Sequence, residues 1–325
     1  MNFYMAPLEG ISGYNFRNAI HTYFGTGIDK YFTPFIEPHL QKKNLKTREL
    51  NDILPEHNQG LYLVPQVMTN SAEAFLYLEA ELRPYGYHEL NINLGCPSPT
   101  VVTKARGAGL LQYANRLDEM LAEIYEKTDC EISIKTRIGY SDPDEWPLLL
   151  DIYNKYPLKE LIIHTRVRDE LYNGTPHYDA FTYALTHSQH KLCYNGDINS
   201  IEDYEALLDF INTHASGHQA DAVMAGRGML TDPKLLQKLA AYNVDGTHLA
   251  PLKKEEIKAF SDHLIRVYSE TLFGETTVLH KMKELWTWLI RLFPDREKLL
   301  KKIVKAKTLT AFNEAVDNAL RVYPY

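Results

Sequence analysis

Residues 89–94, ELNINL, form a short run rich in apolar side chains, and a second run, EISIKT, follows at residues 131–136. Between them, residues 117–127, LDEMLAEIYEK, place apolar side chains three or four positions apart, which is the spacing of an amphipathic helix. A strand, a helix and a second strand in this order predict a βαβ unit with two parallel strands.

The same alternation extends along the first 225 residues. Eight short apolar or β-branched runs begin about 30 residues apart, which is the size of a βαβ unit. Because no reversed strand pair interrupts them, they favour a closed barrel over an open sheet, and we expect an α/β fold, a (β/α)8 TIM barrel. The predicted strands are Asn2–Ala6, Lys30–Thr33, Leu61–Val67, Glu89–Leu94, Glu131–Thr136, Glu160–His164, Lys191–Tyr194 and Ala222–Ala225.

Beyond Pro251 the strand pattern stops, and helical patterns separated by Gly274, Pro294 and Thr308 take its place. They cover residues 255–273, 277–293, 295–304 and 308–320. We therefore expect a C-terminal all-helical domain. The predicted boundary assigns residues 1–245 to the barrel and residues 246–325 to the helical domain.

The chain of 325 residues is 45% hydrophobic and 24% charged, which is typical of a folded soluble protein and excludes disordered, collagen-like and disulfide-stapled chains. It has no apolar run of about 18 residues and no signal-peptide pattern, so we expect no membrane partner. Three cysteines without CxxC spacing argue against disulfides and against a metal site. The expectation is a cytoplasmic monomer with free thiols and no bound metal.

The formal net charge of −7 conceals an uneven distribution along the chain. Residues 281–307 carry nine Lys or Arg against three Asp or Glu, so part of the helical domain is basic. A local excess of this kind indicates an anionic partner, and the alternative interpretation is a solvated helix face.

Polar side chains end nearly every predicted strand, where the active site of a parallel barrel is built. Two of them indicate specific chemistry. Gly226-Arg227-Gly228 follows the eighth strand, and glycines there let backbone N–H groups approach a phosphate, although an ordinary tight turn is the alternative. Lys135 is predicted to point into the barrel, as is Ser133, and the Lys135 ammonium needs an anion or an electron-rich ring there unless it reaches solvent at the rim.

Cys96 lies between Gly95 and Pro97 on a constrained loop at a strand end. No residue beside it in the sequence would make it a thiolate, so we expect a neutral thiol that can donate a proton. His164 also ends a strand, and it is either a structural histidine or part of the same site.

The segment Asn91-x-Asn93-x-Gly95-Cys96-Pro97-Ser98-Pro99, followed by KARGAGLL at residues 104–111, resembles the signature loop of the tRNA-dihydrouridine synthases. The segments at 6–12, 134–139, 164–166, 195–198 and 225–228 occur in this family's order and at its spacing. Leu8, Thr165 and Val167 depart from the Met, Gly and Thr that the family usually has at these positions.

The resemblance implies an FMN-dependent reductase. NADPH or NADH would reduce the flavin, which would pass hydride to C6 of a uracil ring in tRNA, while Cys96 protonates C5 and Asn93 helps to hold the uracil. The residues that match the family's FMN contacts are Pro7, Leu8, Glu9, Gln66, Lys135, His164, Asn195, Gly196, Asp197, Gly226 and Arg227.

Basic side chains expected at the barrel mouth would contact the tRNA, with Lys104, Arg106 and Arg166 assigned to the substrate. The whole expected set is Lys42, Lys43, Lys46, Arg48, Lys104, Arg106, Arg137, Arg166 and Arg168. The target uridine would have to be flipped out of the tRNA fold to reach the flavin.

Three other functions remain open from the residues alone. An FMN barrel that reduces a free small molecule explains the phosphate loop, Lys135 and His164 equally well, but not the basic helical domain or the Asn93–Cys96 loop. A sugar-phosphate aldolase or isomerase would bind no flavin. An RNA-binding protein without catalysis would make no dihydrouridine.

Overall fold

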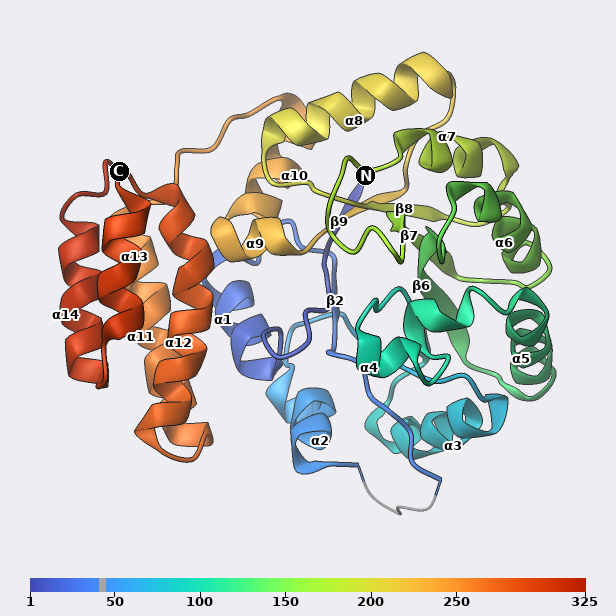
Figure 1. Cartoon of the computed structure of the whole chain (residues 1–325), viewed down its shortest axis with the longest axis horizontal. Helices are drawn as coiled ribbons and strands as arrows, with labels where there is room; N and C mark the ends of the chain where they lie inside the picture. The colour runs from blue at the N-terminus through green and yellow to red at the C-terminus, as the bar shows by residue number, and fades with distance from the viewer. Residues whose placement is uncertain (41–44) are drawn as a thin grey trace.

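The chain folds into a parallel β-barrel with a bundle of helices beside it (Figure 1). The computed structural model describes residues 1–40 and 45–325, and within them nine short strands form one sheet in the order β3-β2-β1-β9-β8-β7-β6-β5-β4. β3 (Leu63–Val64) and β4 (Gln66–Val67) are two pieces of one extended segment and stand at opposite ends of that order. The sheet therefore closes through this segment into an eight-stranded barrel, which confirms the predicted fold class.

The predicted strands recur with small differences. The third is interrupted at Pro65, because proline has no N–H to donate to a neighbouring strand. Two strands run on past their predicted ends at Thr136 and His164, and the residues beyond those ends pair with each other. The remaining strands are β1 (Asn2–Met5), β2 (Lys30–Phe32), β5 (Glu89–Leu94), β6 (Glu131–Gly139), β7 (Glu160–Val167), β8 (Leu192–Asn195) and β9 (Ala222–Ala225).

Helices connect the strands and cover the outside of the barrel (Figure 1). Ser71 begins one of them by accepting a hydrogen bond from the backbone N–H of Ala74 at 3.2 Å. Among the described residues, no helix has the length and apolar character needed to cross a membrane. The helices of this part are α1 (Tyr14–Phe24), α2 (Thr47–Ile53), α3 (Ala72–Leu82), α4 (Pro99–Val102), α5 (Ala114–Lys127), α6 (Trp146–Tyr153), α7 (Tyr178–His187), α8 (Ile201–His214), α9 (Arg227–Thr231) and α10 (Leu235–Asp245).

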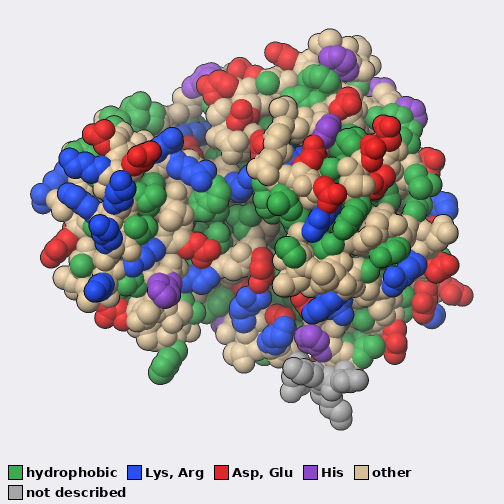
Figure 2. All heavy atoms as spheres, in the orientation of Figure 1, with side chains coloured by type: hydrophobic (Ala, Val, Ile, Leu, Met, Phe, Trp, Pro, Cys, Tyr) green, Lys and Arg blue, Asp and Glu red, His purple; other side chains and the backbone are tan. Residues whose placement is uncertain are grey.

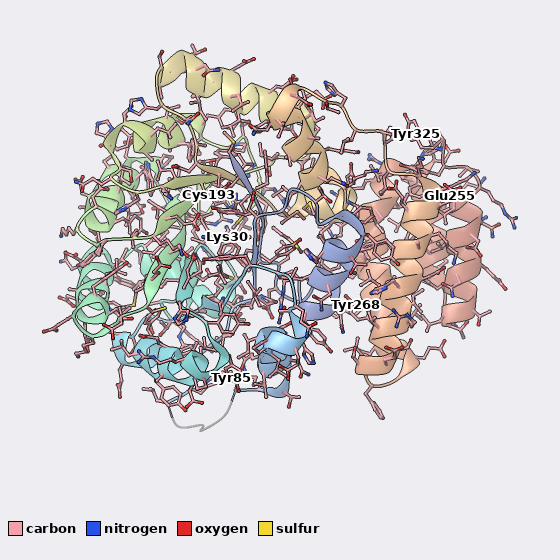
Figure 3. All side chains as sticks on the ribbon, turned by 180° about the vertical axis from the view of Figure 1, so that it is seen from behind. Lys30, Tyr85, Cys193, Glu255, Tyr268 and Tyr325 are labelled. Atoms are coloured by element: carbon pink, nitrogen blue, oxygen red, sulfur yellow. The ribbon has the colours of Figure 1, made fainter. Side chains whose placement is uncertain are left out.

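The barrel has two separate cores because strand side chains alternate between its inside and its outside. Ile132 and Ile134 belong to the larger core between sheet and helices, so Ser133 and Lys135 point inward, as predicted. The inner core is small, and Cys193 lies in it at the strands that the helices surround (Figure 3). Its members are Tyr4, Ala6, Phe32, Val64, Ile162, Cys193, Ala222 and Met224.

The C-terminal bundle consists of α11 (Lys254–Thr271), α12 (Glu275–Leu289), α13 (Arg296–Lys305) and α14 (Leu309–Leu320), and no strand occurs in this described part. It packs beside α1 and α9 (Figure 1). Phe260 of α11 lies with its ring centroid 6.0 Å from that of Phe16 and 5.5 Å from that of Phe24. The Lys281 ammonium of α12 donates to the carbonyl of Gly10 in the loop after β1. Aromatic packing and this hydrogen bond hold the bundle against the barrel.

Candidate active site

A cavity of about 830 Å³ opens where the strands end, within the size range of cofactor and substrate sites. Figure 2 shows it as the hollow between the barrel and the helical bundle. Every residue expected to contact FMN lines this cavity: Pro7, Leu8, Glu9, Gln66, Lys135, His164, Asn195, Gly196, Asp197, Gly226 and Arg227. Asn93 and Cys96 line it as well.

Lys135 is a cation on the cavity wall without a matching anion. Its Nζ donates to Asn195 Oδ1 at 2.8 Å, and the Asn195 side chain in turn donates to the carbonyl of Met224 at 2.8 Å. In the described part of the chain no carboxylate forms an ion pair with it. Burial, followed by the charge of Arg137, lowers the pKa of Lys135 to about 8. The site therefore fits a ligand that places negative charge next to the Lys135 ammonium.

His164 is a neutral residue of the same wall. Burial, with the neighbouring charges of Arg137, Lys135, Arg166 and Arg227 adding to it, holds the pKa of His164 well below its usual value. An imidazole in this state carries one donor and one acceptor nitrogen and no charge. It is therefore suited to hydrogen bonding with a ligand and not to neutralising a phosphate.

Asp197 holds two arginines at the far side of the cavity. Its carboxylate forms ion pairs with Arg166 and Arg227, and the Tyr172 ring centroid lies 4.6 Å from the Arg227 guanidinium carbon. The turn requires glycine before it, because Gly196 has φ +155 and a Cβ there would lie 2.8 Å from the hydroxyl of Tyr194. The turn thus fixes the Arg227 guanidinium at the rim.

Asn93 fixes the backbone of the loop that carries Cys96. Its Oδ1 accepts hydrogen bonds from the backbone N–H groups of Gly95 and Cys96, both at 3.0 Å. Its Nδ2 donates to Gln66 Oε1 at 2.7 Å. Since Asn93 is only 7% exposed, the geometry gives it a positioning role beside the uracil contact expected from the sequence.

The hydrogen bonds continue from Asn93 into the barrel. Gln66 Nε2 donates to Asn91 Oδ1 at 2.8 Å, and Asn91 Nδ2 donates to the Ser133 hydroxyl at 2.9 Å. We call the four side chains of Ser133, Asn91, Gln66 and Asn93 the amide relay. Each is buried and has a partner, as buried polar groups require.

The thiol of Cys96 is half-buried and faces the cavity. Burial raises the pKa of this thiol, so it stays protonated at neutral pH and can act as a proton donor. The turn at Gly107 packs directly against it. Gly107 has φ +52, and a Cβ at this position would lie 2.9 Å from the carbonyl oxygen of Cys96.

The three basic residues assigned to the substrate do not line the cavity, unlike Asn93. Arg166 is 0% exposed, and its Nε donates to the carbonyl of Asn173 at 2.9 Å. Arg106 lies at a neighbouring cavity of about 330 Å³ and forms an ion pair with Glu37 at 3.2 Å. Lys104 is exposed outside the main cavity. Of the three, Arg166 is a positioning residue for Asp197 and no surface contact.

The other basic residues expected at the mouth divide in the same way. Lys46, Arg48 and Arg137 all line the cavity, but Arg137 is buried and donates to the carbonyls of Gly95, Val167 and Leu171 at 2.9, 2.8 and 2.6 Å. It thereby ties the loop after β5 to the loop after β7. Arg168 pairs with Asp169 at 2.8 Å. Lys42 and Lys43 lie outside the described residues.

Several contributors to the site had no assigned role in the sequence. Asn91 stood in the signature motif, and Ser133 was predicted to point inward, so their link was within reach of the period-two pattern. Tyr172 and Trp288 also line the cavity. They come from a long loop and from the helical domain, and no local pattern indicates where either side chain lies.

Sequence comparisons find relatives of this chain among the dihydrouridine synthases. A family model described as dihydrouridine synthase (Dus) matches residues 4–322. The tRNA-dihydrouridine synthase B of Vibrio parahaemolyticus is 26% identical over 79% of this chain and 77% of its own length. The protein of the same name from Shewanella oneidensis is 28% identical over 83% of this chain and 80% of its own. A probable tRNA-dihydrouridine synthase from Staphylococcus epidermidis is 26% identical over 73% of this chain and 71% of its own.

Proposed function

This chain belongs to the dihydrouridine synthase family of flavin-dependent enzymes, and from that we propose that it reduces the C5–C6 double bond of specific uridines in tRNA, with FMN as the flavin and NADPH or NADH as the reductant. The relatives that match most of its length are named as tRNA enzymes, which supports tRNA as the substrate. The flavin, once reduced by the nicotinamide, supplies the hydride that uracil takes up at C6.

The residues of the cavity fit an anionic ring cofactor. Lys135 presents a cation without a carboxylate partner in the described chain, and reduction of a flavin places negative charge on its pyrimidine ring. Gln66, Asn195 and neutral His164 offer hydrogen bonds beside it. These groups would bind and orient the ring.

The phosphate of FMN would lie against Arg227 and the glycines after β8 and β9. Arg227 is held by an ion pair with Asp197, and Gly226 lines the cavity, where a Cβ would lie 3.3 Å from the Ala6 side chain. Gly196 serves the turn that aims Asp197. Together with Pro7, Leu8 and Glu9, these residues complete the proposed cofactor contacts.

Cys96 would donate the proton that completes the reduction. Hydride adds to C6, the C5–C6 π bond breaks, and the thiol proton passes to C5, which leaves a thiolate that water reprotonates. The raised pKa of Cys96 keeps the proton on sulfur until the substrate arrives. The position of this thiol on the wall of the same cavity as Lys135 is the observation that carries the proposal.

We propose residues 246–325 as the tRNA-binding domain. Its α13 presents exposed lysines that form no ion pair with any residue of the described chain, and Figure 2 shows Lys and Arg gathered over this part of the molecule. Lys281 is not among them, because its ammonium is bound to Gly10. The free lysines of this helix and its end are Lys301, Lys302, Lys305 and Lys307.

Lys46 and Arg48, which line the cavity, and Lys104, which is exposed outside it, would contact the tRNA backbone as well. Phosphate contacts of this kind make binding depend strongly on salt. Its tRNA substrate and its free thiols favour the cytoplasm as the site of action, with the single chain as the working unit.

The direct test is purification followed by assay. We expect a yellow protein that converts uridine to dihydrouridine in unmodified tRNA when NADPH is supplied. A colourless protein that takes up no flavin contradicts the proposal. A yellow protein that oxidises NADPH with a small enone or free pyrimidine, but never with tRNA, favours the small-molecule reductase instead.

A further inference from the structure

Within the described chain, Trp288 is the one residue of the C-terminal helices that lines the central cavity. It lies on α12, and α12 and the turn at Ile290–Leu292 pack against α9, which begins with Arg227. The Trp288 side chain is half-buried. It therefore stands at the rim between the barrel and the helical bundle.

The surroundings of Trp288 differ from those of a core tryptophan. Trp286, two residues earlier, is fully buried, donates its indole N–H to the Ser261 hydroxyl at 3.1 Å and meets Phe312 edge-on. The indole N–H of Trp288 has no partner in residues 1–40 and 45–325. A tryptophan that only held the bundle together would be expected to resemble Trp286.

Arg291 stacks on Trp288. Its guanidinium carbon lies 4.0 Å from the ring centroid, a distance typical of a cation–π contact. Arg291 is exposed, and no acidic side chain of the described chain pairs with it. The pair thus consists of an aromatic ring that lines the cavity and, stacked on one face of that ring, a positive charge that is available to a ligand.

A flat surface beside a free guanidinium matches the chemistry of a single-stranded nucleotide, whose base stacks on aromatic rings while its phosphate attracts arginine. A uridine that is flipped into the cavity leaves its neighbour in the strand without one stacking partner. From these observations, and resting on the function proposed above, we propose that Trp288 and Arg291 form a subsite that stacks the base next to the extruded uridine.

The subsite predicts a separation between the two half-reactions. Reduction of the bound flavin by NADPH involves no RNA, so Trp288→Ala leaves its rate and the KM for NADPH as in the wild type. The KM for tRNA rises about tenfold, within the range for loss of one stacked base, and Trp288→Phe restores most of it. Arg291→Ala raises the KM about threefold and reduces the salt dependence of binding.

Phe273→Ala is the matched control, because Phe273 is an aromatic side chain of the same bundle, is 98% exposed and does not line the cavity. It leaves both KM values unchanged. A KM for NADPH that rises with Trp288→Ala would instead assign the subsite to the dinucleotide, and overturns the proposal.

The decisive experiment combines protein and RNA changes in a double-mutant cycle. The target uridine is first mapped with the wild type, and a tRNA is then made that is abasic next to it. The wild type binds this abasic tRNA about tenfold more weakly than intact tRNA. Trp288→Ala binds the two tRNAs equally well. Independent, additive losses refute the stacking contact. If the wild type forms no dihydrouridine at all, the proposed function itself is refuted. If the wild type modifies tRNA and Trp288→Ala has the same KM for tRNA, only the subsite is refuted.

Discussion

The Asn93 side chain offers a sharp test of how the chain holds its proton donor. Its Oδ1 accepts from the backbone N–H groups of Gly95 and Cys96, and its Nδ2 donates to Gln66. Asn93→Ala removes all three hydrogen bonds. At about 1 kcal/mol each, the free energy of unfolding falls by roughly 3 kcal/mol, which lowers the melting temperature of a chain this size by about 4 °C.

Asn93→Ala also slows the reaction with tRNA. Without its two backbone anchors the Cys96 thiol shifts relative to the bound uracil, and a displacement of about 1 Å costs on the order of 10²-fold in rate. We expect tRNA to reoxidise the NADPH-reduced flavin about a hundred times more slowly. Reduction by NADPH, which does not use the thiol, keeps its rate in rapid-mixing measurements of flavin absorbance.

Two further variants separate positioning from direct contact with uracil. Asn93→Asp still accepts from both backbone N–H groups, so it retains most of the rate that Asn93→Ala loses. Gln112→Ala, which removes an amide bonded to the Gly109 carbonyl at 2.9 Å, is the control and reoxidises normally. If Asn93→Asp is as slow as Asn93→Ala, or if Asn93→Ala is as fast as the wild type, the anchoring role is wrong.

Three more predictions concern stability and tRNA binding. The pKa of Lys135 is about 8 in the folded chain and 10.5 in the unfolded chain, so between these pH values the unfolded state binds more protons. The free energy of unfolding of the flavin-free protein therefore rises by up to about 3 kcal/mol as the pH rises through this range. Urea unfolding at pH 7.5 and pH 10 measures this rise, and Lys135→Met is expected to lack it. An equal rise in the wild type and in Lys135→Met contradicts the burial of a charged amine. Gly196→Ala combines a positive φ with a Cβ 2.8 Å from the Tyr194 hydroxyl, so its free energy of unfolding falls by about 3 kcal/mol in thermal unfolding. Gly217→Ala has a positive φ in open space and is the control, with a fall of about 1 kcal/mol. Equal falls in the two variants would contradict a destabilising contact with Tyr194. Glu replaces the four free lysines at Lys301, Lys302, Lys305 and Lys307. These substitutions weaken tRNA binding about a hundredfold near 0.1 M salt and reduce the slope of log affinity against log salt concentration by about 3. Unchanged binding in a filter assay refutes the basic surface.

The sequence predicted the barrel well because its strands are buried on both faces and interrupt the helical pattern clearly. Glu89–Leu94 and Ala222–Ala225 begin and end where the apolar runs do. The break at Pro65 was not predicted, because apolar side chains on both sides of this proline favoured one continuous strand. The extension of β6 to Gly139 depends on pairing with β7, which no local pattern specifies.

The cavity residues at strand ends were predictable for the same reason, since the barrel brings all eight ends together. The basic residues were harder to assign, because charge alone does not distinguish an exposed arginine from a buried one. Arg137 donates to carbonyls of the loops after β5 and β7, and Arg166 to carbonyls of the loop after its own strand, so only the tertiary structure shows that both guanidinium groups are buried. Trp288 was not predicted because it depends on how the helical bundle packs against α9.

The central claim, that one cavity holds the flavin and the proton-donating thiol, is tested most directly by Cys96→Ala. Cys130→Ala, at a half-buried thiol that does not line the cavity, serves as the control. We predict that Cys96→Ala binds flavin and is reduced by NADPH at the wild-type rate, yet is reoxidised by unmodified tRNA at least a hundred times more slowly, while Cys130→Ala behaves normally. Dihydrouridine formation by Cys96→Ala at the wild-type rate would contradict the account.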